Sequence, residues 1–223
     1  MSGRQILVIG ASRGIGLELV RQYCTTGEQV CGTGRSPVGL AAIRSCGAEA
    51  IALDVSEVSS CAHFAWPVRA ARIDVLIYCA GIFSPSSSLE APEEAVFDAL
   101  MHTNVLGAMR ILPPLFEALA PNARLAIMSS NIGVMSKRMN ARHWLYRASK
   151  AAVNSVLRDI AIVLAERAIC VSLHPGWVRT ELGGQNADID VHESVSGIRR
   201  TLDALMSSDN GQFFSYDGTT LPW

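Results

Sequence analysis

Tyr146 and Lys150 are the clearest candidates for catalytic residues in this chain. They lie four positions apart in the stretch WLYRASK. Positions four apart share one face of a helix. If 146–164 is helical, positions 146, 150, 153, 157, 160 and 164 form one stripe, whose last four members are Val, Leu, Ile and Leu. This stripe predicts that the tyrosine and the lysine face inward at the start of a helix. The alternative is a pair of ordinary helix residues.

A tyrosine beside a lysine at the edge of a core can exchange a proton with a substrate. A free tyrosine has a pKa of about 10, and a nearby ammonium lowers it by stabilising the phenolate. Tyr146 is therefore a candidate to protonate an alkoxide during reduction, or to accept a proton during oxidation. We expect Lys150 to lower the pKa of Tyr146. Ser130, after an apolar run, is a candidate donor to a substrate carbonyl.

The stretch ILVIGASRGIG near the N-terminus predicts a phosphate-binding turn. Four apolar residues indicate a strand, Gly10, Gly14 and Gly16 punctuate a turn, and apolar residues at helical spacing follow. Glycines permit the tight turn and the close approach of a pyrophosphate, and the helix N-terminus offers free N–H groups. The spacing is Gly-x3-Gly-x-Gly, so the alternative is a structural turn between a strand and a helix.

Two arginines favour NADP(H) over NAD. The second expected strand ends in CGTGRS and carries no carboxylate that would bind the ribose 2′-hydroxyl of NAD. Arg35 at this strand end and Arg13 in the first turn suit a 2′-phosphate instead. The alternative is two solvated surface arginines.

Composition restricts the class of protein. The chain has 223 residues, 49% of them hydrophobic, and a net charge of −1, which suits an α/β protein with a substantial core and gives no basic face for nucleic acid. The six cysteines show no metal-like spacing, and neither do His143, His174 and His192. We expect no metal, no membrane span and a reduced, cytoplasmic protein.

Strand-like and helix-like segments alternate along the whole chain, which predicts one doubly wound, Rossmann-type domain over 1–223 with helices on both faces of a parallel sheet. The apolar runs are typical of strands that are covered on both sides. About seven strands are expected, at 5–10, 29–33, 48–53, 74–79, 124–129, 169–174 and 212–215. Helices are expected near 15–26, 37–46, 56–71, 92–119, 144–167 and 193–208.

Taken in order, the motifs GASRGIG, LDVS, YCAG, TNVLG, IMSSNIG, YRASK and HPGWVRT make the sequence similar to the short-chain dehydrogenase/reductase family. The end of the chain, FFSYDGTTLPW, resembles the small C-factor/Sniffer-type carbonyl reductases. The resemblance implies a catalytic set of Asn104, Ser130, Tyr146 and Lys150, in which Asn104 supports a water that links Lys150 to solvent and Lys150 also binds the ribose hydroxyls of the nicotinamide cofactor. The structural alternative for Asn104 is a hydrogen bond to backbone in a helix kink. The implied cofactor-binding residues are Gly10, Ser12, Arg13, Gly14, Ile15, Gly16, Arg35, Asp54, Val55, Cys79, Ala80, Gly81, Tyr146, Lys150, Pro175, Gly176, Val178 and Thr180.

Two departures from the family pattern concern the active site. Cys79 stands where the family has the second asparagine of Asn-Asn-Ala-Gly, and a thiol is a weak hydrogen-bonding partner for bracing strands. Ser130 and Tyr146 are sixteen positions apart, more than is usual, so VMSKRMNARHW carries a short insertion beside the site. Phe83, Trp144, Trp177 and Leu182 are candidates for an apolar substrate pocket, with the core as the alternative.

The leading hypothesis is an NADPH-dependent reductase of aldehydes, ketones or quinones, and the substrate is not readable from the loops. The alternative is a nucleotide-binding sensor or signalling protein on the same scaffold, with incidental catalysis. A second apolar stripe on the expected helix, formed by Ala152, Val156 and Val163, predicts a homodimer or homotetramer.

Overall fold

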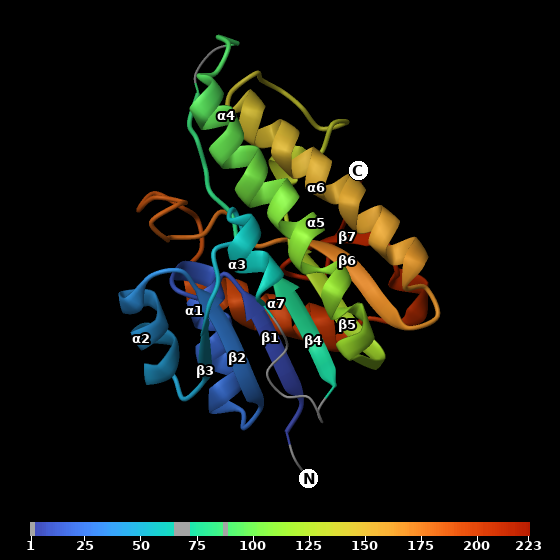
Figure 1. The fold of residues 1–223 in the computed structure, drawn as a ribbon. Coiled ribbons are helices and arrows are strands. Elements are labelled where there is room, and N and C mark those ends of the chain that lie inside the picture. Colours follow the sequence, from blue (N-terminus) through green and yellow to red (C-terminus); the bar gives the residue numbers. More distant parts are fainter. Residues whose placement is uncertain (1–2, 65–71, 87–88) are drawn as a thin grey trace.

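An eight-stranded sheet forms the centre of the computed structural model, which describes residues 3–64, 72–86 and 89–223 (Figure 1). The strand order is β3-β2-β1-β4-β5-β6-β7-β8, and every neighbouring pair is parallel except β7 and β8. The strands are β1 (Gln5–Ile9), β2 (Gln29–Gly34), β3 (Glu49–Ala52), β4 (Ile73–Tyr78), β5 (Leu119–Met128), β6 (Ala168–His174), β7 (Gln212–Ser215) and β8 (Thr220–Leu221). The chain reverses its direction of winding at β1, which lies between β2 and β4.

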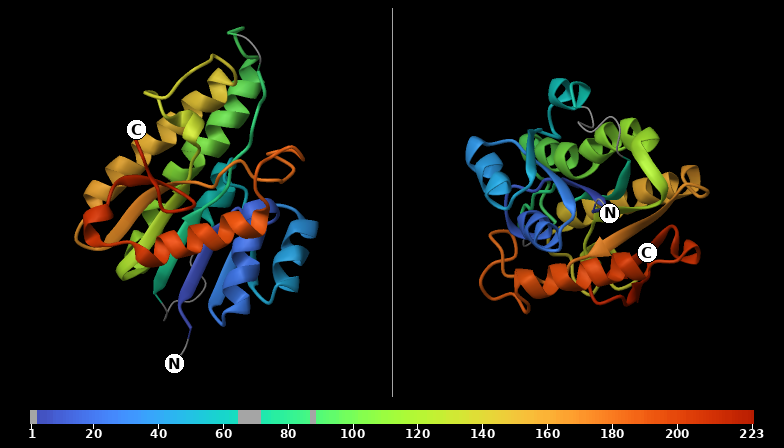
Figure 2. Two further views of the ribbon diagram at one scale, coloured as in Figure 1. Left: turned by 180° about the vertical axis from the view of Figure 1, so that it is seen from behind. Right: turned by 90° about the horizontal axis from the view of Figure 1, so that it is seen from below.

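Helices cover both faces of this sheet (Figure 2). One apolar core lies beneath α3 (Val58–Ala62), α5 (Gly107–Ile111) and α6 (Trp144–Val163). The other lies beneath α1 (Gly14–Thr25), α2 (Pro37–Ser45) and α7 (Val191–Ala204). Alternate residues of one strand enter the two cores: Leu7 and Ile9 enter the first, and Ile6 and Val8 enter the second. The continuous apolar run of β1 is therefore explained by burial on both sides.

The inward stripe of α6 is confirmed. Tyr146 and Lys150 are buried, and so are the four apolar residues that continue the stripe, which are Val153, Leu157, Ile160 and Leu164. The helix begins at Trp144, two positions before the tyrosine. The pair therefore lies at the helix end nearest the carboxyl edge of the sheet.

The long helix expected near 92–119 is divided into several pieces. It consists of α4 (Glu94–Met101), a π-helical turn at His102–Leu106, α5, and a 3₁₀ turn at Pro113–Ala118. The π turn contains Asn104, and such insertions in helices frequently occur at functional sites.

Several other boundaries differ from the expectations. The sheet gains an antiparallel strand, β8, and β5 begins at Leu119 instead of 124, with a register irregularity opposite β4. Where a helix was expected near 56–71, α3 covers only Val58–Ala62, and 65–71 lies outside the described residues. The sixth and seventh helices end at Val163 and Ala204, which is earlier than expected.

Candidate active site and cofactor cleft

A cleft of about 600 Å³ opens at the carboxyl ends of the strands, around the reversal at β1. Crevices at this position are where doubly wound sheets bind ligands. The cleft brings together sixteen of the predicted site residues from six segments of the chain. They are Gly10, Ser12, Arg13, Gly14, Ile15, Gly16, Arg35, Asp54, Val55, Cys79, Ala80, Gly81, Tyr146, Lys150, Pro175 and Thr180.

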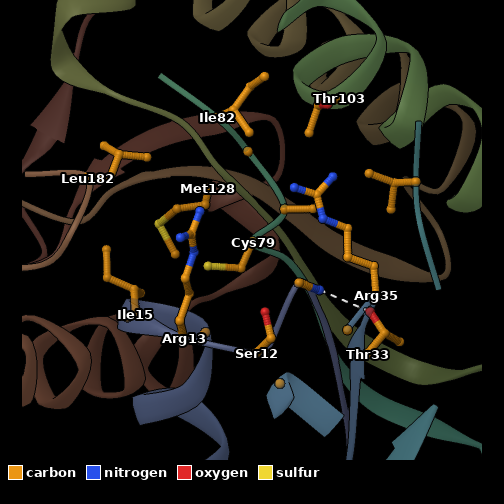
Figure 3. A pocket seen from close by; sticks show the side chains of 18 of the residues that line it. Ser12, Arg13, Ile15, Thr33, Arg35, Cys79, Ile82, Thr103, Met128 and Leu182 are labelled. Carbon is orange, nitrogen blue, oxygen red and sulfur yellow. Dashed lines mark hydrogen bonds between the residues drawn. The ribbon is translucent and has the colours of Figure 1, made fainter. Parts of the chain in front are cut away.

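The first turn has the geometry that its glycines predict. Gly10 has a φ of 85°, and a Cβ there would lie 2.6 Å from the backbone of Ala80. A Cβ at Gly16 would lie 2.2 Å from the carbonyl oxygen of Gly10. The N–H of Gly10 donates to Oγ1 of Thr33 over 3.0 Å, which joins the ends of β1 and β2 (Figure 3). A side chain at either position would push these backbone segments apart.

The N-terminus of α1 faces the cleft without a cap. Ser36 and Asp190 cap α2 and α7 with side-chain oxygens, but the side chain at the N-cap of α1, Arg13, accepts no backbone hydrogen bond. The first turn of α1 also contains no acidic residue. The end of the helix therefore offers N–H groups and a positive dipole end to an anion, and a pyrophosphate fits this arrangement.

Both predicted phosphate-binding arginines line the cleft, and both are paired with carboxylates. Figure 3 shows the side chains of Arg13 and Arg35 on either side of Cys79. Nη1 of Arg35 lies 3.5 Å from Oδ2 of Asp54, and Arg13 forms an ion pair with Glu181. Because these arginine side chains are more than half exposed, the pairs are weak and the guanidinium groups can turn to another anion.

Tyr146 lies in an apolar environment at the other end of the cleft. Its side chain packs with Leu100, Leu145 and Phe83, and the Phe83 ring meets its ring edge-on, with centroids 4.9 Å apart. Burial raises the pKa of Tyr146 to about 12. The tyrosine is therefore a neutral phenol over the physiological pH range.

Lys150 is buried, and its ammonium donates to the carbonyl oxygen of Met128 over 2.9 Å. Its Nζ lies 5.6 Å from the centroid of the Tyr146 ring. Burial lowers the pKa of Lys150 to about 8, so the group is mostly charged at neutral pH. The expectation that Lys150 lowers the pKa of Tyr146 is not met here, because burial of the phenol dominates and moves the pKa upward.

Ser130 lies beside the cleft, one position beyond Ser129, which lines it. The Ser130 hydroxyl caps the short 3₁₀ turn Asn131–Gly133 by accepting from the N–H of Ile132 over 3.4 Å. Because the Ser130 oxygen is the acceptor in this contact, its O–H is able to donate to a ligand.

Asn104 is buried outside the lining of the cleft and braces the loop after β4. Its Oδ1 accepts from the N–H of Ile82 over 2.8 Å, and its Nδ2 donates to the carbonyl oxygen of Ile82 and to Oγ of Ser149, each over 3.0 Å. This geometry matches the structural alternative for an asparagine in a helix kink. The water-linking role implied by the family resemblance stays a prediction.

Cys79 lines the cleft directly after β4, at the position where the family pattern has an asparagine. Burial raises the pKa of its thiol to about 11, although the charge of Lys150 opposes this shift. The thiol is therefore neutral. The segment after β4 is braced instead by Asn104, which hydrogen-bonds to the backbone of Ile82, three positions after Cys79.

The segment after β6 contributes only part of what was predicted. Pro175 and Thr180 line the cleft, whereas Gly176 and Val178 do not. Val178 is buried and forms a β-bridge with Ile189. The Thr180 hydroxyl donates to the carbonyl oxygen of Val178 and accepts from the N–H of Gly183, so it shapes the loop.

Three contributors were missed by the sequence reasoning. The carbonyl of Met128 has no sequence signal, because every residue carries one. Thr33 could have been noticed as a polar residue inside a buried strand. The ion pair between Glu181 and Arg13 could not, because it joins two loops that are far apart in the sequence. Of the apolar candidates, Leu182 lines the cleft and Phe83 packs on Tyr146, while Trp144 and Trp177 are partly exposed.

Comparison with known proteins identifies the family. A sequence profile described as short chain dehydrogenase matches residues 4–189. C-signal of Myxococcus xanthus is 34% identical over 163 residues, which cover 72% of this chain and 98% of that protein. The chain belongs to the short chain dehydrogenase family of oxidoreductases.

Solved structures of carbonyl reductases and related proteins have the same fold. A short-chain dehydrogenase/reductase from Burkholderia multivorans with bound NADP has a TM-score of 0.89 and 30% identity, and the match covers 99% of this chain and 100% of that chain. The carbonyl reductase Sniffer of D. melanogaster has a TM-score of 0.87 and 28% identity over the same shares of the two chains.

In the described parts of the chain, no helix combines the length and the apolar character needed to span a bilayer. Within the same residues, no group of three or more His, Cys, Asp or Glu side chains is arranged to hold a metal ion.

Proposed function

We propose that this protein is an NADPH-dependent reductase that converts an aldehyde, ketone or quinone to an alcohol. One observation carries the proposal: the buried Tyr146 and Lys150 line the same cleft as the uncapped glycine turn. A phenol, an ammonium and a phosphate-binding turn in one cleft are the groups that hydride transfer to a carbonyl requires. We propose that a single domain, 1–223, both binds the cofactor and carries out catalysis.

The cleft suits a dinucleotide with a 2′-phosphate. The uncapped N-terminus of α1 would hold the pyrophosphate, and Asp54 and Val55 would contact the adenine. Arg35 and Arg13 would exchange their carboxylate partners for the 2′-phosphate, a bidentate acceptor that guanidinium groups favour. The Burkholderia relative with bound NADP supports NADP over NAD. When bound, the nicotinamide supplies the hydride.

Tyr146 then supplies the proton. An alkoxide is about as basic as hydroxide, the conjugate base of water with a pKa of about 15.7. A phenol with a pKa of about 12 is neutral at pH 7 and still acidic enough to protonate that alkoxide. The raised pKa therefore favours reduction, whereas oxidation at neutral pH would need a base that the phenol does not provide.

Lys150, Ser130 and Asn104 support this step. The Lys150 ammonium would bind the ribose and stabilise negative charge near the phenol, and the Ser130 hydroxyl would donate to the carbonyl oxygen and polarise it. Asn104 would hold the loop at Ile82, beside both the cofactor and the substrate. These roles account for a buried ammonium whose protein acceptor is a single carbonyl.

The surroundings of Tyr146 favour an apolar carbonyl compound. Phe83, Leu145 and Ile132 surround the phenol, and Leu182 lines the cleft nearby. Such a wall binds the apolar body of a substrate and leaves the oxygen to the tyrosine and the serine. We therefore expect aromatic aldehydes, ketones and quinones to be better substrates than small polar ones.

The second candidate is a nucleotide-binding signalling protein, and the similarity to C-signal is the observation that favours it. It predicts tight NADPH binding without turnover of any carbonyl. The presence of Tyr146 and Lys150 in the same cleft as the glycine turn favours the enzyme, because a protein that only binds a nucleotide does not need both groups there.

The deciding experiment measures NADPH oxidation with a panel of aldehydes, ketones and quinones, beside NADPH affinity by calorimetry. We expect turnover of at least one carbonyl class by the wild type. We also expect Tyr146→Phe to lose at least roughly 100-fold in kcat with nearly unchanged NADPH affinity. Tight NADPH binding without wild-type turnover would favour the signalling protein.

We also propose that the chain forms a homodimer or homotetramer in the cytoplasm. Ile162 and Val163, at the end of α6, are 71% and 72% exposed, which is unusual for two adjacent large apolar residues. Of the predicted apolar stripe, Val156 packs against the core, whereas Val163 is exposed. The flank of α6 that carries Val163 is the face we expect to pack against a second copy.

A further inference from the structure

His143 occupies an unusual position immediately before α6, three residues from Tyr146. Its φ of 58° and ψ of 37° put a non-glycine residue in the left-handed region. Such conformations persist where surrounding contacts hold them, and they frequently occur next to functional sites. The contacts of this histidine therefore need an explanation.

Two reciprocal hydrogen bonds join His143 to a distant loop. Its N–H donates to the carbonyl oxygen of Ser86 over 2.9 Å, and its ring Nδ1 accepts from the N–H of Ser86 over 3.1 Å. The two residues are 57 positions apart, so the contact ties the segment before α6 to the segment after β4. Both segments adjoin the tyrosine, the first along the chain and the second through Phe83.

The His143 ring also begins a row of three aromatic rings. It meets Phe83 edge-on with centroids 5.0 Å apart, and Phe83 in turn meets Tyr146 edge-on at 4.9 Å. Edge-to-face pairs restrict the orientation of both rings. The backbone link to Ser86 and the ring contact thus hold the same loop, with Phe83 pressed against the phenol.

The histidine must be neutral to make both contacts. A neutral imidazole can accept at Nδ1, whereas an imidazolium donates from both nitrogens and would repel the N–H of Ser86. Burial, together with the nearby charges of Arg147 and Arg142, lowers the pKa of His143. The facing segment, 83–86, contains no ionisable side chain.

We propose that His143 is a positioning residue that fixes Phe83 against Tyr146 and thereby sets the preference of the site for aromatic carbonyl substrates. The proposal rests on the proposed reductase function and adds its specificity determinant. His143 acts through Phe83 and touches neither cofactor nor reacting atoms. A small aliphatic aldehyde reaches the tyrosine without needing the Phe83 wall, whereas an aromatic ketone packs on it.

The test compares His143→Ala, His143→Asn and Phe83→Leu with the wild type, using NADPH with an aromatic ketone and with a small aliphatic aldehyde. Asparagine tolerates the left-handed conformation and offers an acceptor oxygen, so it preserves the link to Ser86 but not the ring contact. We expect His143→Ala and Phe83→Leu to raise KM for the aromatic ketone roughly tenfold. In His143→Ala, the aldehyde kinetics and the NADPH affinity should stay within about threefold of wild type. His143→Asn should give an intermediate KM.

The pH profile provides a readout that a merely structural role would not change. Wild-type kcat/KM for the aromatic ketone should fall on the acidic side, below the ordinary histidine pKa of about 6.5, and this fall should be absent in His143→Asn. Equal losses for both substrates, or wild-type kinetics and pH dependence in all three variants, would overturn the role of His143. Absence of turnover by the wild type would instead remove the reductase function itself.

Discussion

Replacing Lys150 with methionine should stabilise the fold while abolishing activity. The lysine is 5% exposed, and burial lowers its pKa from 10.5 to about 8. A pKa difference of this size between the unfolded and folded states corresponds to roughly 3 kcal/mol of free energy of unfolding, lost at any pH below 8. Methionine has a similar length and no charge to desolvate.

The hydrogen bond to Met128 reduces this gain. Lys150→Met leaves the carbonyl oxygen of Met128 without its donor, which costs roughly 1–2 kcal/mol. At pH 7 we therefore expect Lys150→Met to be more stable than wild type by about 1–2 kcal/mol. The lysine would be retained in spite of this because the chemistry requires its charge.

The pH dependence of this difference has a defined sign. Between pH 8 and 10.5 the unfolded chain binds more protons at Lys150 than the folded chain does, so wild-type stability rises with pH relative to the variant. The advantage of Lys150→Met should shrink by about 1.4 kcal/mol for each pH unit in this window and disappear by about pH 9. All other groups titrate alike in the two proteins and cancel.

Urea unfolding at pH 7 and pH 9 measures both effects. The chain has only two lysines, and Lys137 is exposed, so Lys137→Met is a matched control that should change stability at neither pH. With ¹³Cε-labelled lysine, two NMR signals should be resolved, and that of Lys150 should titrate near pH 8. A Lys150→Met variant less stable than wild type at pH 7, or a difference independent of pH, would refute the reasoning.

Two further predictions concern the cofactor and one concerns assembly. Arg35→Ser should weaken NADPH binding roughly 10- to 100-fold by calorimetry and leave NADH affinity within about threefold, whereas equal losses would contradict a contact with the 2′-phosphate. Glu181→Gln frees the arginine of the first turn and should tighten NADPH binding up to about fivefold, and weaker binding would contradict this competition. The double variant Ile162→Lys, Val163→Lys should be a monomer in light scattering. Val58→Lys, at another exposed apolar position, should leave the oligomer intact. A wild type that is monomeric at micromolar concentration would contradict the assembly.

The features that could be predicted from sequence depend on local periodicity. Buried residues of the stripe from Tyr146 to Leu164 recur with the helical period of 3.6 residues, and those of β1 occupy consecutive positions. Each pattern is visible within its own segment of the sequence. The glycine turn was readable because Gly10 and Gly16 stand where the backbone approaches itself too closely for a Cβ.

The features that could not be predicted depend on partners far away in the sequence. Pro121 and Asn122 lie at an irregularity inside β5, where pairing with β4 stops after Leu119 and resumes at Arg124, and Asn122 has a φ of 60°. The link between His143 and Ser86 is set by how two loops meet. The direction of the Tyr146 pKa was wrong because desolvation depends on the packed fold and not on the neighbouring lysine alone.

The most direct measurement of the central claim is hydride transfer from NADPH carrying deuterium at both positions of C4 of the nicotinamide. We predict that wild-type protein, given an aromatic carbonyl substrate, places one deuterium on the carbinol carbon of the alcohol, as read by mass spectrometry. Tyr146→Phe, loaded with the same cofactor, should yield almost none. Product without deuterium, or equal labelling by the two proteins, would contradict a reduction that depends on the proton of Tyr146.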